Sequence, residues 1–467
     1  MEETNRGAGV TEAVARFVTE TRYDALPTEV VAAAKVAIFD GIANMLAGAT
    51  QPLSAIVVDY LKQMGGNPQC TVVGHDLRTN APSAAFANGI FLHCLDYEIQ
   101  GQPVAHGTSN ILPPALALAE MSSASGTRLI EAYVIGWEIN ARLRKASVRC
   151  DTRGYHPPGL IGPLSAAAAS AKILGMDAAG VRMALGIAAS HTGGLTANTG
   201  TMVKSTHPGN AARTGVESAL LAQAGFESRD GILEAQRGFV ETLFGAGFDW
   251  DELTRDLGTR FQLVDPGYNI KRYPAQIFMQ WVIESAVTVR QRHDFRPEDI
   301  TYVELEVPGT HERSGHAGAA SSGLDGKFDF AYCGAVAIAD GRVDIDSFSD
   351  AKRFSPTVES ILKKVRIKRN PDIPKNPPDN WAVARVGLQD GRVLSETCRH
   401  YRGSIANPMD REERLVKLRD CAKRSLDSAD IERVIGMAEA LESLPDVRAL
   451  MLVLGHRSVK ADGQVKQ

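Results

Sequence analysis

The stretch Thr301-Tyr-Val-Glu-Leu-Glu-Val-Pro308 decides the fold expected for this chain, because it is the clearest strand in a sequence dominated by helical patterns. Val303, Leu305 and Val307 alternate with glutamates, as in a strand that buries one face. We therefore expect a unit that contains a sheet within a mainly helical protein.

Two further strand signals follow this stretch and give the unit its extent. Residues 364–368 alternate in the same way, and residues 382–397 form a hairpin around the turn Asp390-Gly391. Residues 330–339, which lie between these strand signals, have a helical pattern. The sequence thus predicts a smaller α+β lid domain over residues 267–401, inserted before the C-terminal helices.

The sequence on both sides of this unit is helical and rich in alanine and leucine. Residues 165–170, Ser-Ala-Ala-Ala-Ala-Ser, are small enough for close helix packing, and helical patterns resume after Pro408. We expect a discontinuous helical domain over residues 1–266 and 402–456, and a loose polar tail over 457–467. An insert whose ends rejoin the body favours a site in the cleft at the junction.

The composition limits the classes of partner that we expect the protein to bind. The net charge of −4 and the ordinary charged content of 23% give no argument for nucleic acid or an anionic membrane. The six cysteines are widely spaced, without a CxxC or Cys/His finger pattern, which favours free thiols in a reducing compartment. The sequence shows no secretion signal and no apolar run of membrane-spanning length, so we expect a cytoplasmic protein.

Lys204 and His207 lie three residues apart in the segment Lys204-Ser-Thr-His207-Pro-Gly-Asn-Ala-Ala212, just before a helical run. On a helix they share one face, where an ammonium and an imidazole can hold a carboxylate and move a proton. On this segment alone, a structural role for the pair is the alternative.

Asp96, His106 and His156 lie in similarly marked segments. Asp96 and His106 flank a loop, so that the carboxylate can orient the imidazole; a helix-terminal acid and a capping histidine are the alternative. His156 precedes two prolines, which hold it extended. The basic residues upstream of it form either a funnel for anions or, more ordinarily, a solvated helix face: Arg142, Arg144, Lys145, Arg149 and Arg153.

Motifs for nucleotides, metals and acyl-enzymes are missing from the sequence. There is no GxGxxG after a strand, no GxxxxGK[ST], no HExxH and no GxSxG. By sequence spacing, His93 and His106 form no metal set with a nearby pair. We expect a site without metal or cofactor that carries out proton chemistry on a small polycarboxylate.

These segments, in this order, resemble the MmgE/PrpD family, which includes 2-methylcitrate dehydratase-like enzymes, cis-aconitate decarboxylase and iminodisuccinate epimerase. The resemblance runs from the helix with Asp40-Gly-Ile-Ala-Asn44 to the C-terminal helices, and includes Tyr155-His156-Pro157-Pro158. The segments Ser190-His191 and 204–212 look most like the cis-aconitate decarboxylase branch. The resemblance implies a mainly helical domain with a smaller α+β lid, a homodimer, and no cofactor.

Position by position, the resemblance also implies site residues. The catalytic set comprises Asp96, His106, His156, Lys204 and Lys271. Tyr332 matches a pocket tyrosine of the family. The substrate-binding set that we expect comprises Lys204, His207, Lys271, Gln276, Tyr332, Gln100 and His191. Gln276 stands where the decarboxylase branch has a histidine, and an amide exchanges no proton near neutral pH.

We therefore expect a cofactor-independent lyase for a small di- or tricarboxylate, resembling cis-aconitate decarboxylase or 2-methylcitrate dehydratase. His106, oriented by Asp96, is the first candidate base or acid and His156 the second, while Lys204 and Lys271 stabilise negative charge. An epimerase or isomerase of a substituted dicarboxylate is the first alternative, which Gln276 favours slightly. A non-catalytic ligand-binding protein on the same scaffold is the second.

Overall fold

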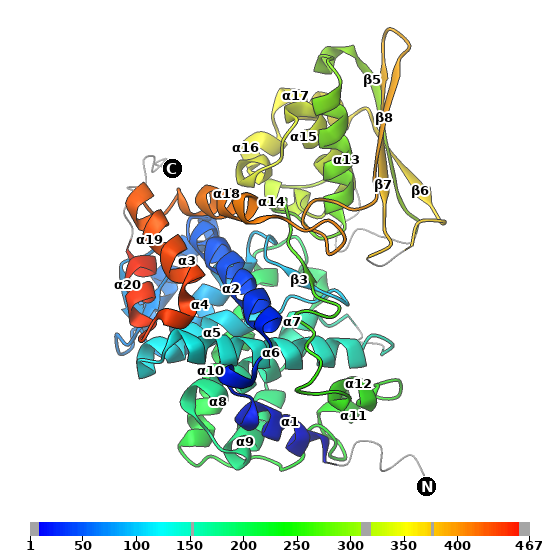
Figure 1. Cartoon of the computed structure of the whole chain (residues 1–467). Coiled ribbons are helices and arrows are strands. Elements are labelled where there is room, and N and C mark those ends of the chain that lie inside the picture. The colour runs from blue at the N-terminus through cyan, green and yellow to red at the C-terminus, as the bar shows by residue number, and fades with distance from the viewer. Residues whose placement is uncertain (1–8, 151–153, 310–318, 375–377, 457–467) are drawn as a thin grey trace.

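The computed structural model describes residues 9–150, 154–309, 319–374 and 378–456 (Figure 1). Figure 1 shows a helical body with a smaller sheet-containing lid above it. This confirms the mainly helical fold with a smaller α+β unit that the sequence predicted. The predicted tail over 457–467 lies outside the described residues.

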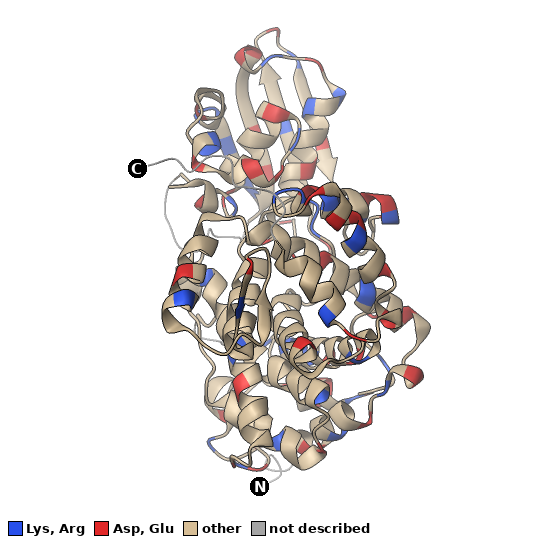
Figure 2. Cartoon of the chain, turned by 90° about the vertical axis from the view of Figure 1, so that its left-hand side faces the viewer, with Lys and Arg blue, Asp and Glu red and all other residues tan. Residues whose placement is uncertain are grey.

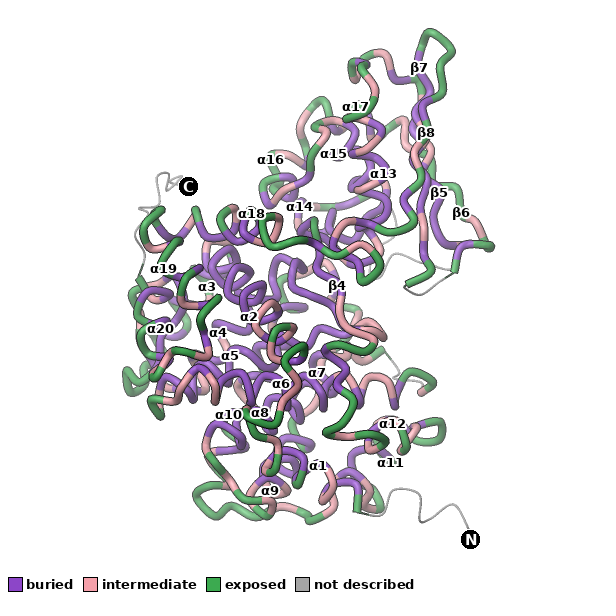
Figure 3. The backbone as a smooth tube through the Cα atoms, in the orientation of Figure 1, coloured by how far each residue is buried: buried purple, intermediate pink, exposed green. Residues whose placement is uncertain are grey.

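The body is built from the N-terminal helices together with the helices that follow the lid. Its longer helices are α1 (Val10–Glu20), α2 (Thr28–Gly48), α3 (Pro52–Met64), α4 (Ala81–His93), α5 (Thr108–Ser122), α6 (Gly126–Ala146), α8 (Gly162–Leu174), α9 (Ala178–Ala189), α10 (Val203–Gln223), α18 (Arg411–Ala422), α19 (Ser428–Glu439) and α20 (Arg448–Gly455). The tube in Figure 3 shows their inward faces buried and their outer turns exposed.

Helix α2 has the length and apolar composition of a membrane span, but it is a core helix of the body. In its most apolar window, 72% of the residues are buried. It packs against α4, α6 and α18 in the body. Burial among helices of the same chain explains its apolar composition.

The lid contains a mixed four-stranded sheet in the order β6-β5-β7-β8. Its strands are β5 (Ile300–Pro308), β6 (Val365–Asn370), β7 (Ala382–Leu388) and β8 (Val393–Cys398). β5 runs parallel to β6 and antiparallel to β7, which forms the predicted hairpin with β8. Helices α13 (Met279–Arg292) and α15 (Phe330–Asp340) pack on the sheet, while the edge strand β6 stays largely exposed.

The body and the lid each have their own hydrophobic core. One core contains buried residues from Val10 to Ile270 and from Met409 to Leu454, with Ile345 from the lid. The other runs from Tyr273 to Tyr401. In the cartoon of Figure 2, ribbon segments with Lys or Arg are interspersed with segments with Asp or Glu in both the body and the lid.

Helix α10 begins at Val203, eight residues earlier than the alanine-rich run alone suggested, and includes Pro208. Gly209 lets α10 approach α4 closely, because a Cβ there would lie 2.8 Å from the carbonyl oxygen of Phe86. The close approach of α10 to α4 brings Lys204, near the start of α10, beside His93, at the end of α4.

The loop after α4 is tied to the start of the lid by a two-residue ladder. Strand β3 (Gln100–Gly101) pairs with β4 (Tyr268–Asn269), with Gln100 opposite Asn269. β4 ends two residues before Lys271. The Asp96–His106 loop and the domain boundary, which are far apart in sequence, therefore lie side by side.

Candidate active site

A cavity of about 600 Å³ lies where the body meets the lid. Its wall combines ionisable groups of the body with amide and apolar groups from both sides of the junction. The lining residues are Asp96, Gln100, Gln102, Pro103, Val104, Ala105, His106, Arg144, Lys145, Val148, His156, Pro157, Pro158, Thr196, Thr199, Lys204, Pro266, Gln276, Ile277 and Phe278.

Asp96 holds two lysines, one from each side of the junction. Its Oδ2 accepts from Lys204 Nζ at 2.5 Å, and its Oδ1 pairs with Lys271 Nζ, which also donates to the Asp96 carbonyl oxygen at 2.7 Å. Asp96 has a left-handed backbone with φ 51°, which turns its carbonyl and carboxylate toward the same ammonium. All three side chains are buried.

This arrangement keeps the carboxylate ionised. Burial alone would raise the pKa of Asp96, but the charges of Lys204 and Lys271 outweigh burial and hold it well below its usual range. Burial lowers the pKa of Lys271, which Asp96 partly offsets. The group carries a net positive charge of about one unit, which suits an anionic substrate.

Glu98 joins two imidazoles behind the cavity wall. Its Oε1 lies 2.7 Å from His93 Nδ1 and 3.1 Å from His106 Nδ1, and its Oε2 accepts from the Ser109 N–H at 2.9 Å. Asp96 lies 3.9 Å from His106 on the other ring nitrogen, Nε2. In this structure Glu98 makes the hydrogen bond that holds the ring of His106, while the carboxylate of Asp96 is engaged by the two lysines.

The second ring nitrogen of each histidine meets a donor. His93 Nε2 lies 3.1 Å from Lys204 Nζ, and His106 Nε2 lies 2.7 Å from Gln100 Nε2. Burial, and the lysine charges nearby, lower the pKa of both histidines well below the usual value of 6.5. Both rings are therefore neutral at physiological pH, each with one protonated and one free nitrogen.

The protonation of Glu98 decides which nitrogen of His106 is free. Burial raises the pKa of Glu98 to about 8, although Ser109 stabilises the carboxylate. An ionised Glu98 accepts from Nδ1–H and leaves Nε2 of His106 free as a base. A protonated Glu98 can instead donate to Nδ1, which places the ring proton on Nε2 as an acid once the Gln100 amide is turned so that its oxygen accepts from Nε2–H. The pair can therefore hold His106 ready for either direction of proton transfer.

His156 lines the cavity and is held from behind by His207. The two Nδ1 atoms lie 3.0 Å apart, so one ring donates to the other and leaves Nε2 of His156 for the cavity. The backbone N–H of His156 donates to the Gly194 carbonyl oxygen at 2.9 Å. Burial lowers the pKa of His156 well below its usual value, with the Lys204 charge adding to the effect. His156 is thus a second neutral imidazole in position to exchange a proton.

His93, His106 and His156 converge with ligand atoms within 4.8 Å of one another, a spacing that could hold a metal ion. Sequence spacing did not indicate this set, because His93 ends α4 and His156 lies some sixty residues beyond it in the sequence. Lys204 Nζ is 3.1 Å from the Nε2 of His93, where it opposes a cation electrostatically. The charges around the three rings favour an anion over a metal ion.

Four of the predicted site residues lie outside the cavity wall. Lys271 and His207 stand directly behind it, in contact with Asp96 and His156 respectively. Tyr332 is fully buried in the lid core, donates to the Ser347 carbonyl oxygen and does not line the cavity. His191 is exposed just after the end of α9, where its Nδ1 meets the Ile187 carbonyl oxygen, and it does not line the cavity either.

Sequence reasoning missed several buried polar residues at the junction. Glu98 and His93 were not selected, although Glu98 lies in the same loop as Asp96. Lys327 reaches from the lid to the Leu95 carbonyl oxygen at 3.1 Å, and burial lowers its pKa to about 8. A lysine in a glycine-rich lid turn gives no local signal that it will be buried in another domain.

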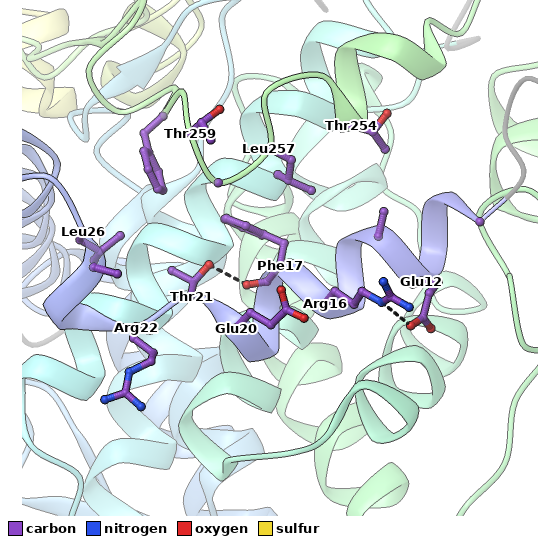
Figure 4. Close-up of a pocket in the computed structure, with 15 residues that line it drawn as sticks. Glu12, Arg16, Phe17, Glu20, Thr21, Arg22, Leu26, Thr254, Leu257 and Thr259 are labelled. Atoms are coloured by element: carbon purple, nitrogen blue, oxygen red, sulfur yellow. Dashed lines mark hydrogen bonds and ion pairs between the residues drawn. The ribbon is translucent and has the colours of Figure 1, made fainter.

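A second cavity of about 620 Å³ runs along α1 and lacks these features (Figure 4). The residues drawn there include Glu12 and Arg16, which pair with each other at 3.0 Å. Among the described residues, no histidine lines it. The cavity at the junction is therefore the candidate active site.

Comparison with known families matches nearly the whole chain. The MmgE/PrpD N-terminal domain matches residues 12–251, and the MmgE/PrpD C-terminal domain matches residues 273–443. The chain belongs to the MmgE/PrpD family. The second match extends past the lid into α18 and α19, which pack in the core of the body.

Several relatives are similar over almost their full length. A mouse protein named cis-aconitate decarboxylase is 29% identical over 476 residues, covering 97% of this chain and 94% of the relative. The human protein of that name is 28% identical over 467 residues, covering 95% and 94%. One from Aspergillus terreus is 26% identical over 485 residues, covering 97% of both.

Proposed function

We propose that this MmgE/PrpD protein is a cofactor-independent lyase that acts on a small di- or tricarboxylate, with cis-aconitate decarboxylation as the first candidate reaction. One observation carries the proposal: the cavity places two neutral imidazoles, His106 and His156, around the ammonium of Lys204. The names of the relatives support the same reaction class.

Lys204 supplies the positive charge that such a reaction needs. When a carboxylate leaves as CO2, the electron pair of the broken C–C bond remains on the substrate and is shared with an adjacent unsaturated carboxylate. A preorganised ammonium in a buried cavity stabilises that charge more than water does. Asp96 fixes the position of Lys204, and Lys271 balances Asp96 from behind.

The remaining step adds a proton to carbon. His106 in its Nε2–H form is the proposed donor, and protonated Glu98 restores the ring proton through Nδ1. His156 is the second candidate donor. In a dehydratase, the same residues act in the opposite sense: one ring removes a proton beside a carboxylate and another protonates the leaving hydroxyl.

An epimerase remains the second candidate function. Gln276 lines the cavity on the lid side, and its amide neither donates nor accepts a full proton near neutral pH. A reaction that removes a proton and returns it to the other face needs two imidazoles but no third acid. His106 and His156 supply such a pair.

Proton NMR in D2O distinguishes these reactions. Purified protein is incubated with cis-aconitate, citrate, 2-methylcitrate and substituted succinates. New vinyl signals with release of CO2 or water support the lyase. Deuterium entering a C–H position without loss of either group supports the epimerase. The absence of any reaction across the panel with well-folded protein would contradict the proposed chemistry.

A further inference from the structure

Arg144 enters the cavity from the last turn of α6, beside Lys145 and Val148. Its Nε donates to the Val104 carbonyl oxygen at 3.0 Å. Val104 is two residues before His106, so the guanidinium is held at a fixed place relative to the proposed proton donor.

Arg144 differs from its basic neighbours on α6 because it has no carboxylate partner in the described part of the chain. Arg142 pairs with Glu138 at 2.5 Å, and Lys145 pairs with Glu252 at 2.7 Å. Burial lowers the pKa of Arg144, and no described acid offsets that effect. A half-buried guanidinium without a counter-ion is costly to maintain unless a ligand supplies the anion.

The chemistry of the group specifies the ligand. A guanidinium offers a planar fork of N–H donors that matches a carboxylate, and with Nε used by Val104 the two terminal nitrogens remain for a bidentate contact. The Lys204 ammonium is already shared with Asp96 and His93. The cavity lining therefore contains three cationic side chains, and among the described residues Lys204 and Lys145 have carboxylate partners whereas Arg144 has none.

We propose that Arg144 binds a second carboxylate of the substrate, apart from the one at Lys204, and so selects di- and tricarboxylates over monocarboxylates. This inference rests on the proposed function, because it assumes that the substrate's reacting end lies against Lys204 and the imidazoles. It adds to that proposal the residue that recognises the second carboxylate.

Binding of an unreactive ligand tests the inference without catalysis. Propane-1,2,3-tricarboxylate is titrated by calorimetry and butyrate by ligand-observed NMR, into the wild-type chain and into Arg144→Gln. Loss of a charge-assisted bidentate contact predicts tricarboxylate binding that is roughly 10- to 100-fold weaker, with butyrate binding unchanged. Arg149→Gln is the matched control, since Arg149 is an exposed arginine outside the cavity lining and its loss should leave both affinities unchanged.

Three results would overturn the inference. They are an unchanged tricarboxylate affinity in Arg144→Gln, an equal loss in Arg149→Gln, and an equal loss of butyrate binding. If Arg144→Gln does not fold, Arg144→Lys keeps the charge but not the fork, and an affinity equal to wild type would overturn the inference instead. Wild-type protein that binds no polycarboxylate would contradict the proposed function itself, a failure visible before any variant is made.

Discussion

Lys417 Nζ lies 2.7 Å from Oδ1 of Asp40, and both side chains are buried directly beneath the cavity. Lys417 also donates to the carbonyl oxygens of Tyr97 and Lys271, each at 2.9 Å. The other oxygen of Asp40 accepts from the Ile99 N–H at 3.2 Å. One ion pair between α18 and α2 thus fixes the backbone that follows Asp96 and the backbone at Lys271.

Removing one member of this pair should destabilise the protein more than removing both. Lys417→Met leaves Asp40 buried without its counter-ion and should lower the free energy of unfolding by roughly 3–5 kcal/mol. The double variant Asp40→Asn, Lys417→Met removes that charge and should recover part of the loss. Urea denaturation measures all three proteins, and simply additive effects would contradict the coupling.

Loss of the proposed proton donor should reduce turnover while the fold is retained. His106→Gln is expected to lower kcat by roughly 10²- to 10⁴-fold, because positioned proton transfer supplies a factor of that size. Steady-state kinetics and circular dichroism measure the two properties. His191→Gln is the control: the ring is exposed and outside the cavity, so its activity should match wild type. Equal activity of the two variants would remove His106 from the mechanism.

The rate of CO2 release should depend on pH through the ionisation of Glu98. The Nε2–H form of His106 requires a protonated Glu98, whose pKa is raised to about 8 by burial. Turnover by decarboxylation should therefore be high below pH 8 and fall as the pH rises through it. Glu98→Gln cannot ionise and should lose this limb of the profile. A wild-type profile that rises through pH 8 would indicate that His106 acts as a base instead.

The free energy of unfolding should also depend on the ionisation of Glu98 between pH 6.5 and 8. A carboxyl with a raised folded-state pKa stabilises the fold at low pH, and this contribution is lost as the pH rises toward about 8. The buried histidines act in the opposite sense, but mainly below their usual pKa of 6.5. Relative to Glu98→Gln, wild type should become less stable from pH 6.5 to 8, as measured by urea denaturation. A constant difference would place the Glu98 pKa outside this window.

Tyr332 should behave as a structural residue. Tyr332→Phe removes the hydrogen bond to the Ser347 carbonyl oxygen inside the lid core and is expected to cost about 1–3 kcal/mol of stability. The ligand cavity is not lined by this ring, so KM should be unchanged. A raised KM with unchanged stability would indicate that Tyr332 takes part in substrate binding.

The sequence predicted the elements better than the contacts between them. Alternation at Val303, Leu305 and Val307 predicts β5 within a residue of its observed start, because one face of that strand is buried against helices. Glu98 could not be identified in this way. Its role depends on His93 from α4 and His106 from the next loop meeting at one oxygen, a contact fixed by tertiary packing.

The positions of His191 and Tyr332 have a physical cause of the same kind. Both belong to segments with the expected residue types, but tertiary structure determines which way each side chain points: His191 lies in the turn after α9, and Tyr332 lies on α15. Tyr332 faces the lid core from α15, as aromatic residues on buried helix faces usually do. Arg144 could not be singled out from the sequence because its neighbours on α6 have the same charge; what distinguishes it is that no acid within the described ranges pairs with it.

The ladder between β3 and β4 makes the arrangement of the site depend on the position of the lid. Gln100 is paired with Asn269 on the segment that leads into the lid, and its side chain touches the Nε2 of His106. A movement of the lid that displaces β4 would also move Gln100 and would break the contact between its side-chain amide and Nε2 of His106. The ladder therefore couples the position of the lid to the hydrogen bond on Nε2 of His106.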